Sequence, residues 1–157
     1  MLTLKRFCGD ELYPLTSSKW YILDNTLWVY LTFSQGMQLH EDTEDLAEEP
    51  TWELSFKIDD ETILKKGSVF ENANESDEDA YLYYCEHNPT YKNRLEILDS
   101  IEDKLLVRIS AECCDVNYYD GSKGNDILEF TAWIEKRKES HRKATPSKRK
   151  FFGIFNR

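Results

Sequence analysis

The most constraining feature of this sequence is a pair of alternating stretches separated by a short glycine-bearing segment. In residues 105–113 every odd position is apolar, and every even position except Leu106 is polar. The same period of two returns in residues 128–134. A period of two places alternate side chains on opposite faces of a β-strand. The sequence therefore predicts an antiparallel hairpin, with Gly121 and Gly124 supplying the positive φ angles of its loop.

Shorter stretches of the same kind occupy much of the remaining chain. Residues 27–33 and 52–58 alternate clearly, and Asp24-Asn25 is a two-residue turn candidate before the first of them. Residues 81–85 and 94–98 add short strands, with Asn88-Pro89 between them as a turn, although the second could also be one helical turn. Near the amino terminus, Leu2 and Leu4 could begin an edge strand, and Pro14 with residues 16–18 is typical of a loop. We count seven or eight short strands and no long helical period. The sequence thus predicts a mostly-β protein, an antiparallel sandwich or closed barrel, with an antiparallel sheet carrying one or two helices as the alternative.

Charge is divided unevenly along the chain. The net charge is −10, yet residues 136–157 hold nine Lys and Arg and one Glu, a net of +8, which leaves −18 on residues 1–135. We therefore expect a single acidic β domain over residues 1–138, followed by a basic, flexible tail over residues 139–157 with an aromatic end. Because an acidic body repels phosphate groups, we expect no direct nucleic-acid binding by the body.

The cysteines and the absence of long apolar runs indicate the cellular compartment in which we expect the protein. No stretch approaches the roughly 18 apolar residues of a membrane span, and the first ten residues lack the apolar core of a signal peptide. Four cysteines are present without a Cys-x-x-Cys pair. We therefore expect a cytoplasmic protein with reduced thiols, with adjacent Cys113 and Cys114 on opposite faces of a strand. A disulfide from one of them to Cys8 or Cys85 is the alternative.

No motif indicates catalysis or a cofactor. The acids around the predicted loop, Asp115 to Asp126, miss the calcium-binding EF-hand pattern because Asp120 stands where the sharp turn requires glycine. The one close cysteine–histidine pair is Cys85 and His87, which we interpret as a core residue and a strand end. We therefore expect a protein that is not an enzyme, with no catalytic residue, no metal and no cofactor.

Two acidic segments are candidates for binding a partner. Clustered carboxylates steer and bind a basic protein, although they also keep an aromatic-rich β protein soluble. The candidate partner-binding residues are Glu41, Asp42, Glu44, Asp45, Glu48, Glu49, Glu75, Asp77, Glu78 and Asp79.

The tail is a separate candidate because it combines cations with bulky apolar side chains. This composition suits a short docking motif or weak contact with an anionic membrane surface, and it is also typical of a disordered chain end. The candidate residues are Lys148, Arg149, Lys150, Phe151, Phe152 and Phe155.

Aromatic side chains also lie opposite the apolar faces of two predicted strands. Trp28, Tyr30 and Trp133 would form one exposed patch if their strands were neighbours, and would be core if another layer covered them. We expect them to be covered.

The combined pattern favours a non-enzymatic protein-binding domain, of the immunity or inhibitor type, that uses acidic loops against a basic protein partner. The alternatives are a β-barrel that binds a small apolar ligand, and an adaptor or peripheral membrane protein that acts through its tail. The sequence does not define an oligomeric state.

Overall fold

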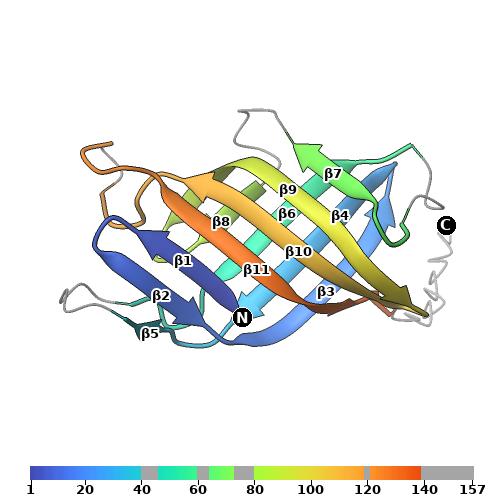
Figure 1. The fold of residues 1–157 in the computed structure, drawn as a ribbon, viewed down its shortest axis with the longest axis horizontal. Coiled ribbons are helices and arrows are strands. Elements are labelled where there is room, and N and C mark those ends of the chain that lie inside the picture. Colours follow the sequence, from blue (N-terminus) through green and yellow to red (C-terminus); the bar gives the residue numbers. More distant parts are fainter. Residues whose placement is uncertain (40–45, 60–63, 73–79, 119–120, 139–157) are drawn as a thin grey trace, which may run out of the picture.

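The computed structural model describes residues 1–39, 46–59, 64–72, 80–118 and 121–138, and all of its regular elements are strands (Figure 1). The predicted mostly-β antiparallel fold is therefore confirmed, although with more strands than expected. The strands are β1 (Leu2–Arg6), β2 (Gly9–Tyr13), β3 (Leu15–Leu23), β4 (Thr26–Phe33), β5 (Met37–Gln38), β6 (Thr51–Lys57), β7 (Val69–Asn72), β8 (Ala80–Tyr83), β9 (His87–Ile101), β10 (Lys104–Cys113) and β11 (Asp126–Glu135).

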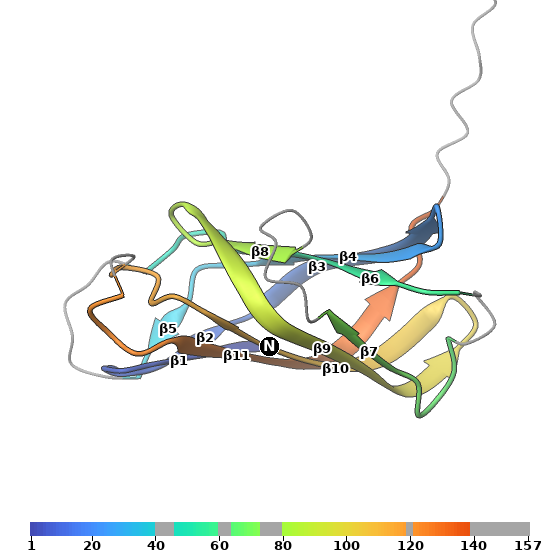
Figure 2. The ribbon, with the colours of Figure 1, turned by 90° about the horizontal axis from the view of Figure 1, so that it is seen from above.

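The strands form one antiparallel path that folds over into two facing layers. Their order is β3-β4-β6-β8-β9-β10-β11-β1-β2-β5, and β7 pairs with β9 beside this path. Figure 2 shows β3, β4, β6 and β8 in one layer, here called the β4 layer, above the β10 layer of β1, β2, β7, β10 and β11. The sheet is not closed into a barrel, so the closed form of the predicted fold is not adopted. No helix in the described part of the chain is long and apolar enough to span a membrane.

Strand β9 connects the two layers. Its first residues, His87 to Pro89, pair with β8, whereas the strand from Thr90 onwards pairs with β10. Lys92 has a φ of 50°, and the register against β10 shifts at the same level, which are the marks of a β-bulge. A bulge bends a strand and increases its twist. The turn that the sequence indicates at Asn88-Pro89 is therefore wrong, because a long bent strand replaces it.

The alternating stretches place their apolar positions in the core, as predicted. Residues 105, 107, 109, 111 and 113 are all buried, and they pair with the inward positions of β11. The apolar faces of β4 and β6 are buried opposite them. Gly121 has the expected φ of 73°, but Gly124 does not have a positive φ. The inward apolar side chains of β10 and β11 therefore pack against those of β4 and β6 to form the core.

Two predictions for the amino-terminal region are wrong. Leu2 and Leu4 were expected to start an edge strand, yet β1 lies between β11 and β2 and buries both. Residues 14–18 were expected to be a loop, but β3 already begins at Leu15. Strand β3 itself is the edge, and Asp24-Asn25 form its two-residue turn to β4, with φ angles of 50° and 54°.

We expect Gly36→Ala to destabilise the fold, because a Cβ atom at Gly36 would lie within 3.0 Å of several ring atoms of Tyr13. The Tyr13 ring is fully buried and its hydroxyl is hydrogen-bonded to Glu11, so it cannot move aside freely. Overpacking of this kind costs about 1–3 kcal/mol. Urea denaturation measures it. Gly124→Ala is the matched control, since nothing lies within 4 Å of its added Cβ, and equal losses in the two variants would contradict the assignment.

Candidate binding surface

The outer face of the β4 layer is lined with aromatic side chains, here called the aromatic face. Inward positions of β4 hold Leu27, Val29 and Leu31, so its alternate residues Trp28 and Tyr30 point outward. The strand register places further rings beside them on β3, β8 and the start of β9. The aromatic face consists of Tyr21, Trp28, Tyr30, Tyr81, Tyr83 and His87.

Three of these rings form a compact group. Tyr21 pairs across strands with Trp28, and Tyr30 is the next outward residue of β4. The three rings are nearly parallel, with centroids 5.9–6.5 Å apart. All three are half-buried, so the second layer that we expected to cover them is not there among the described residues. Such pairs stabilise a sheet and also leave a rigid apolar surface.

Polar groups continue the aromatic face towards β8 and β9. The Tyr81 hydroxyl donates a 3.0 Å hydrogen bond to Glu53 Oε2. The exposed His87 ring packs edge-on against Tyr81 and Tyr83, each at a centroid distance of 5.1 Å. Burial and the hydrogen bond to Glu53 raise the pKa of Tyr81 above its usual value. At neutral pH this phenol is thus a neutral hydrogen-bond donor.

A cleft of about 410 Å³ opens where the aromatic face meets the edge strand β3. The Arg137 guanidinium lies over the Tyr21 ring at 5.3 Å from its centroid, a cation–π contact. The Tyr21 hydroxyl donates to the Tyr30 hydroxyl over 3.3 Å, and burial raises the pKa of Tyr30. The cleft therefore combines rings, hydroxyl groups and cations. Its lining residues are Ser17, Lys19, Tyr21, Tyr30, Thr32 and Arg137.

The opposite outer face, on the β10 layer, has a different character. Its outward side chains form ion pairs across neighbouring strands, which keep each charge matched and solvated. Trp133 is also exposed there, at 38 %, but it lies on β11 and not beside β4, so the three aromatic residues singled out in the sequence do not form one patch. The pairs are Lys5–Glu129, Lys92–Glu112, Arg94–Glu71, Lys104–Glu135 and Arg108–Glu96.

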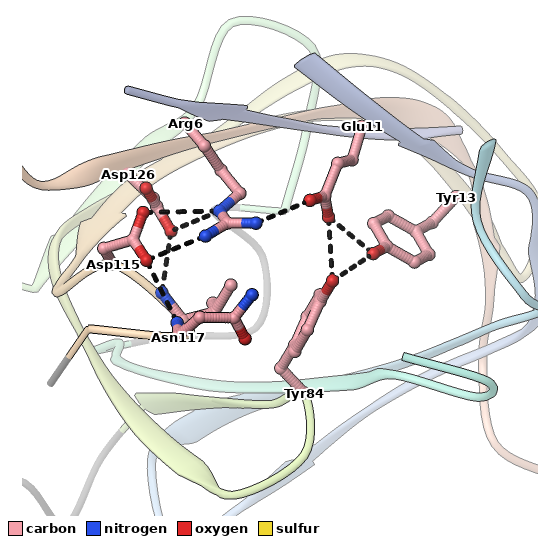
Figure 3. Close-up of polar contacts among 8 residues, drawn as sticks. Arg6, Glu11, Tyr13, Tyr84, Asp115, Asn117 and Asp126 are labelled. Atoms are coloured by element: carbon pink, nitrogen blue, oxygen red, sulfur yellow. Dashed lines mark hydrogen bonds and ion pairs between the residues drawn. The ribbon is translucent and has the colours of Figure 1, made fainter. Parts of the chain in front are cut away.

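A buried polar network occupies one end of the core, between the two layers (Figure 3). The Arg6 guanidinium donates to Glu11 Oε1 at 2.9 Å and to Asp115 Oδ1 at 2.9 Å, and its Nε lies 3.9 Å from Asp126 Oδ2. The side chains of these four residues are at most 1 % exposed. One cation thus faces three acids, and it connects β1, β2 and the β10–β11 connection.

Two tyrosines extend this network to the β4 layer. The hydroxyls of Tyr13 and Tyr84 both hydrogen-bond to Glu11 Oε2, at 2.6 and 2.9 Å, and they lie 2.8 Å from each other. Burial raises the pKa of both phenols well above the usual range. Tyr84 directly follows β8, so these bonds hold the two layers together at this end.

Burial favours the neutral form of Asp126 in this network. Burial, together with the neighbouring Asp115, raises its pKa to about 8. Its Oδ2 accepts the backbone N–H of Val116 at 3.0 Å, whereas its buried Oδ1 has no hydrogen-bond partner among the described residues. An acceptor without a donor favours the protonated form further. With Asp126 protonated, the network holds one fewer negative charge around Arg6.

The sequence contains a signal for this network, which is a charged residue in step with the inward apolar positions of a strand. Arg6 continues the inward positions Leu2 and Leu4, and Asp115 continues the inward series of β10. Asp126 likewise shares the inward face of β11. Charged residues in step with an apolar face are expected to be buried and paired. Among the described residues, no group of His, Cys, Asp and Glu is placed to hold a metal ion.

The candidate residues from the sequence are only partly described. Glu48 and Glu49 are exposed. Glu71, which precedes the candidate acids Glu75 to Asp79 in the sequence, lies in β7 and pairs with Arg94 at 2.6 Å. Cys85 is exposed, so its interpretation as a core residue is wrong. All four cysteines are free, with Cys113 buried. Outside the described residues lie Glu41, Asp42, Glu44, Asp45, Glu75, Asp77, Glu78, Asp79, Lys148, Arg149, Lys150, Phe151, Phe152 and Phe155.

Comparison with known proteins provides no relative. The chain matches no protein-family model, no curated protein and no solved structure.

Proposed function

We propose that this protein is a non-enzymatic binding domain that docks a protein partner on its aromatic face. The contrast between the two outer faces supports this proposal. One face carries five cross-strand ion pairs beside its exposed Trp133, whereas the other presents grouped tyrosine and tryptophan rings and an arginine. Tyr, Trp and Arg are the residues in which binding energy concentrates at protein interfaces. The partner would cover the rings, and the polar groups around them would fix its orientation.

We infer that the partner binds on the aromatic face and not on the acidic segments, within the class of function that the sequence favours. Glu48 and Glu49 are exposed and are free to contribute long-range attraction to a basic partner. Charges of this kind mainly raise the association rate and its dependence on salt. The immunity or inhibitor role predicted from size and charge therefore remains a proposal. In it, the exposed acids attract the basic partner and the rings of the aromatic face bind it.

We expect the double variant Trp28→Ser, Tyr30→Ser to lower affinity for the partner at least tenfold, because truncating central rings typically costs about 2 kcal/mol or more. The partner would be captured at equal stoichiometry from an extract of the cells that make this protein. The affinity of the purified complex would then be measured by calorimetry, with circular dichroism to show that each variant folds.

Two controls make this result specific. Trp133→Ser removes an exposed ring from the opposite face and is expected to leave affinity unchanged. Glu48→Gln with Glu49→Gln is expected to change mainly the association rate. A complex that survives the loss of Trp28 and Tyr30 but fails without the two acids would transfer the site to the acidic segment. The absence of any stoichiometric partner would contradict the proposal itself.

A further inference from the structure

One edge of β3 lies next to the aromatic face. Strand β3 ends the order of the sheet, and among the described strands only β4 pairs with it along its length. On its outer side, the Trp20 carbonyl accepts the N–H of Arg137 at 2.8 Å. The chain after β11 bridges β3 at this one point, between Trp20 and Lys136. Because the bridge is parallel, the end of β11 lies on the amino-terminal side of it, where Glu135 lines a hollow together with Ser17, Ser18 and Lys19.

The hairpin geometry fixes which backbone groups face this edge. Leu23 and Thr26 flank a two-residue turn, so they form a hydrogen-bonded pair, and such pairs alternate along an antiparallel ladder. Trp20 and Ser18 therefore direct their N–H and C=O groups away from β4. The outward carbonyl bond of Trp20 agrees with this alternation. Among the described residues, no backbone group bonds to Ser18 on this side.

A hollow lined by basic side chains follows this edge. Its volume is about 480 Å³, and it meets the cleft on the aromatic face at Lys19 and Arg137. Lys136 and Lys138 also line the hollow. Its one acid, Glu135, bonds to Lys104 at 2.8 Å. The hollow is therefore basic, although the chain as a whole carries −10.

Charge complementarity selects the occupant. A basic groove attracts carboxylates, and it repels residues 139–157, which carry six Lys and Arg and one acid. The chain's own tail is thus the wrong ligand for this site. An extended segment suits a strand edge, because backbone bonds give affinity while alternate side chains give specificity.

We propose that the β3 edge receives an extended acidic segment of the partner protein as an added strand. The segment's backbone bonds to Ser18, and its alternate carboxylates contact Lys19 and Arg137. This inference rests on the proposed function, since the added strand would be continuous with the partner on the aromatic face. It specifies the chemistry of this one segment of the otherwise basic partner: acidic residues at alternate positions, with β-branched residues between them.

The test is a titration of the full ¹⁵N-labelled chain with the blocked peptide Glu-Val-Glu-Val-Glu-Val-Glu, followed by NMR. We expect saturable shifts of Ser18 and its neighbours and slower hydrogen exchange of the Ser18 amide. Lys19→Glu with Arg137→Glu is expected to raise Kd at least tenfold. Arg108→Glu, which reverses one charge on the opposite face, is expected to leave Kd unchanged.

Two further peptides separate strand addition from simple attraction. The Lys-Val analogue should not bind, and the Glu-Val peptide with alternate N-methyl groups should lose binding because its backbone cannot donate. Equal binding of the methylated peptide, or equal weakening by Arg108→Glu, would overturn the inference. If the natural partner depends on Trp28 and Tyr30 but not on Lys19 and Arg137, this inference fails alone. If Trp28 and Tyr30 do not matter, the proposed function fails.

Discussion

Replacing Arg6 by methionine is expected to lower the free energy of unfolding by about 3–5 kcal/mol, the cost of removing one partner from a buried ion pair. The substitution keeps a long side chain but leaves the carboxylates of Glu11 and Asp115 without their cation. Neither acid can reach solvent, because both side chains are at most 1 % exposed. Urea denaturation at pH 7 gives the difference directly.

Two variants establish that charge is the cause. Lys5→Met, one residue away, breaks the exposed Lys5–Glu129 pair and should change stability little. Adding Asp115→Asn to Arg6→Met should recover part of the loss, since it removes one of the buried charges. If the double variant were as unstable as the sum of its parts, lost packing rather than unpaired charge would explain the effect.

Replacing Asp126 by asparagine is expected to stabilise the protein at pH 8, by up to about 1.4 kcal/mol for each unit by which folding raises the pKa of this carboxyl. The pKa of this carboxyl is raised from 3.8 to about 8 in the fold. The folded state therefore binds a proton that the unfolded state releases above pH 3.8. The stability that Asp126 contributes is full below that value and is lost as the pH rises towards 8. Asparagine is neutral throughout and lacks this loss.

The measurement is unfolding free energy against pH for both proteins. The advantage of Asp126→Asn should grow from pH 4 to pH 8 and then level off, because Asp126 is ionised in both states above its folded pKa. The asparagine retains an oxygen for the Val116 N–H, so the backbone contact survives. A difference that is constant across the window, or that favours the wild type at pH 8, would show that Asp126 is ionised in the fold.

Much of the fold is predictable from local pattern. The inward faces of β4, β6, β10 and β11 follow from the period of two, because burial of alternate side chains is a property of each strand alone. The Asp24-Asn25 turn follows from residues that tolerate positive φ. These features do not depend on which strands become neighbours.

The remaining features depend on long-range pairing, which local pattern does not contain. Strand β1 looks like an edge in the sequence, yet it is central because β11 pairs with it from the other end of the chain. The long, bent β9 is hidden by its Asn88-Pro89 pair, which reads as a turn. Arg6 and Asp115 are 109 positions apart, so their bond becomes visible only when the sheet is assembled. The aromatic face likewise requires the β3–β4–β6–β8 order.

The central claim is that the aromatic face is the surface that a partner covers. The most direct measurement is hydroxyl-radical footprinting of the free protein and of its complex, read residue by residue. We expect Trp28, Tyr30 and Tyr81 to be protected from oxidation in the complex, while the exposed ring of Trp133 is oxidised equally in both. Protection of Trp133 with unchanged oxidation of Trp28 and Tyr30 would place the partner on the opposite face and contradict the claim.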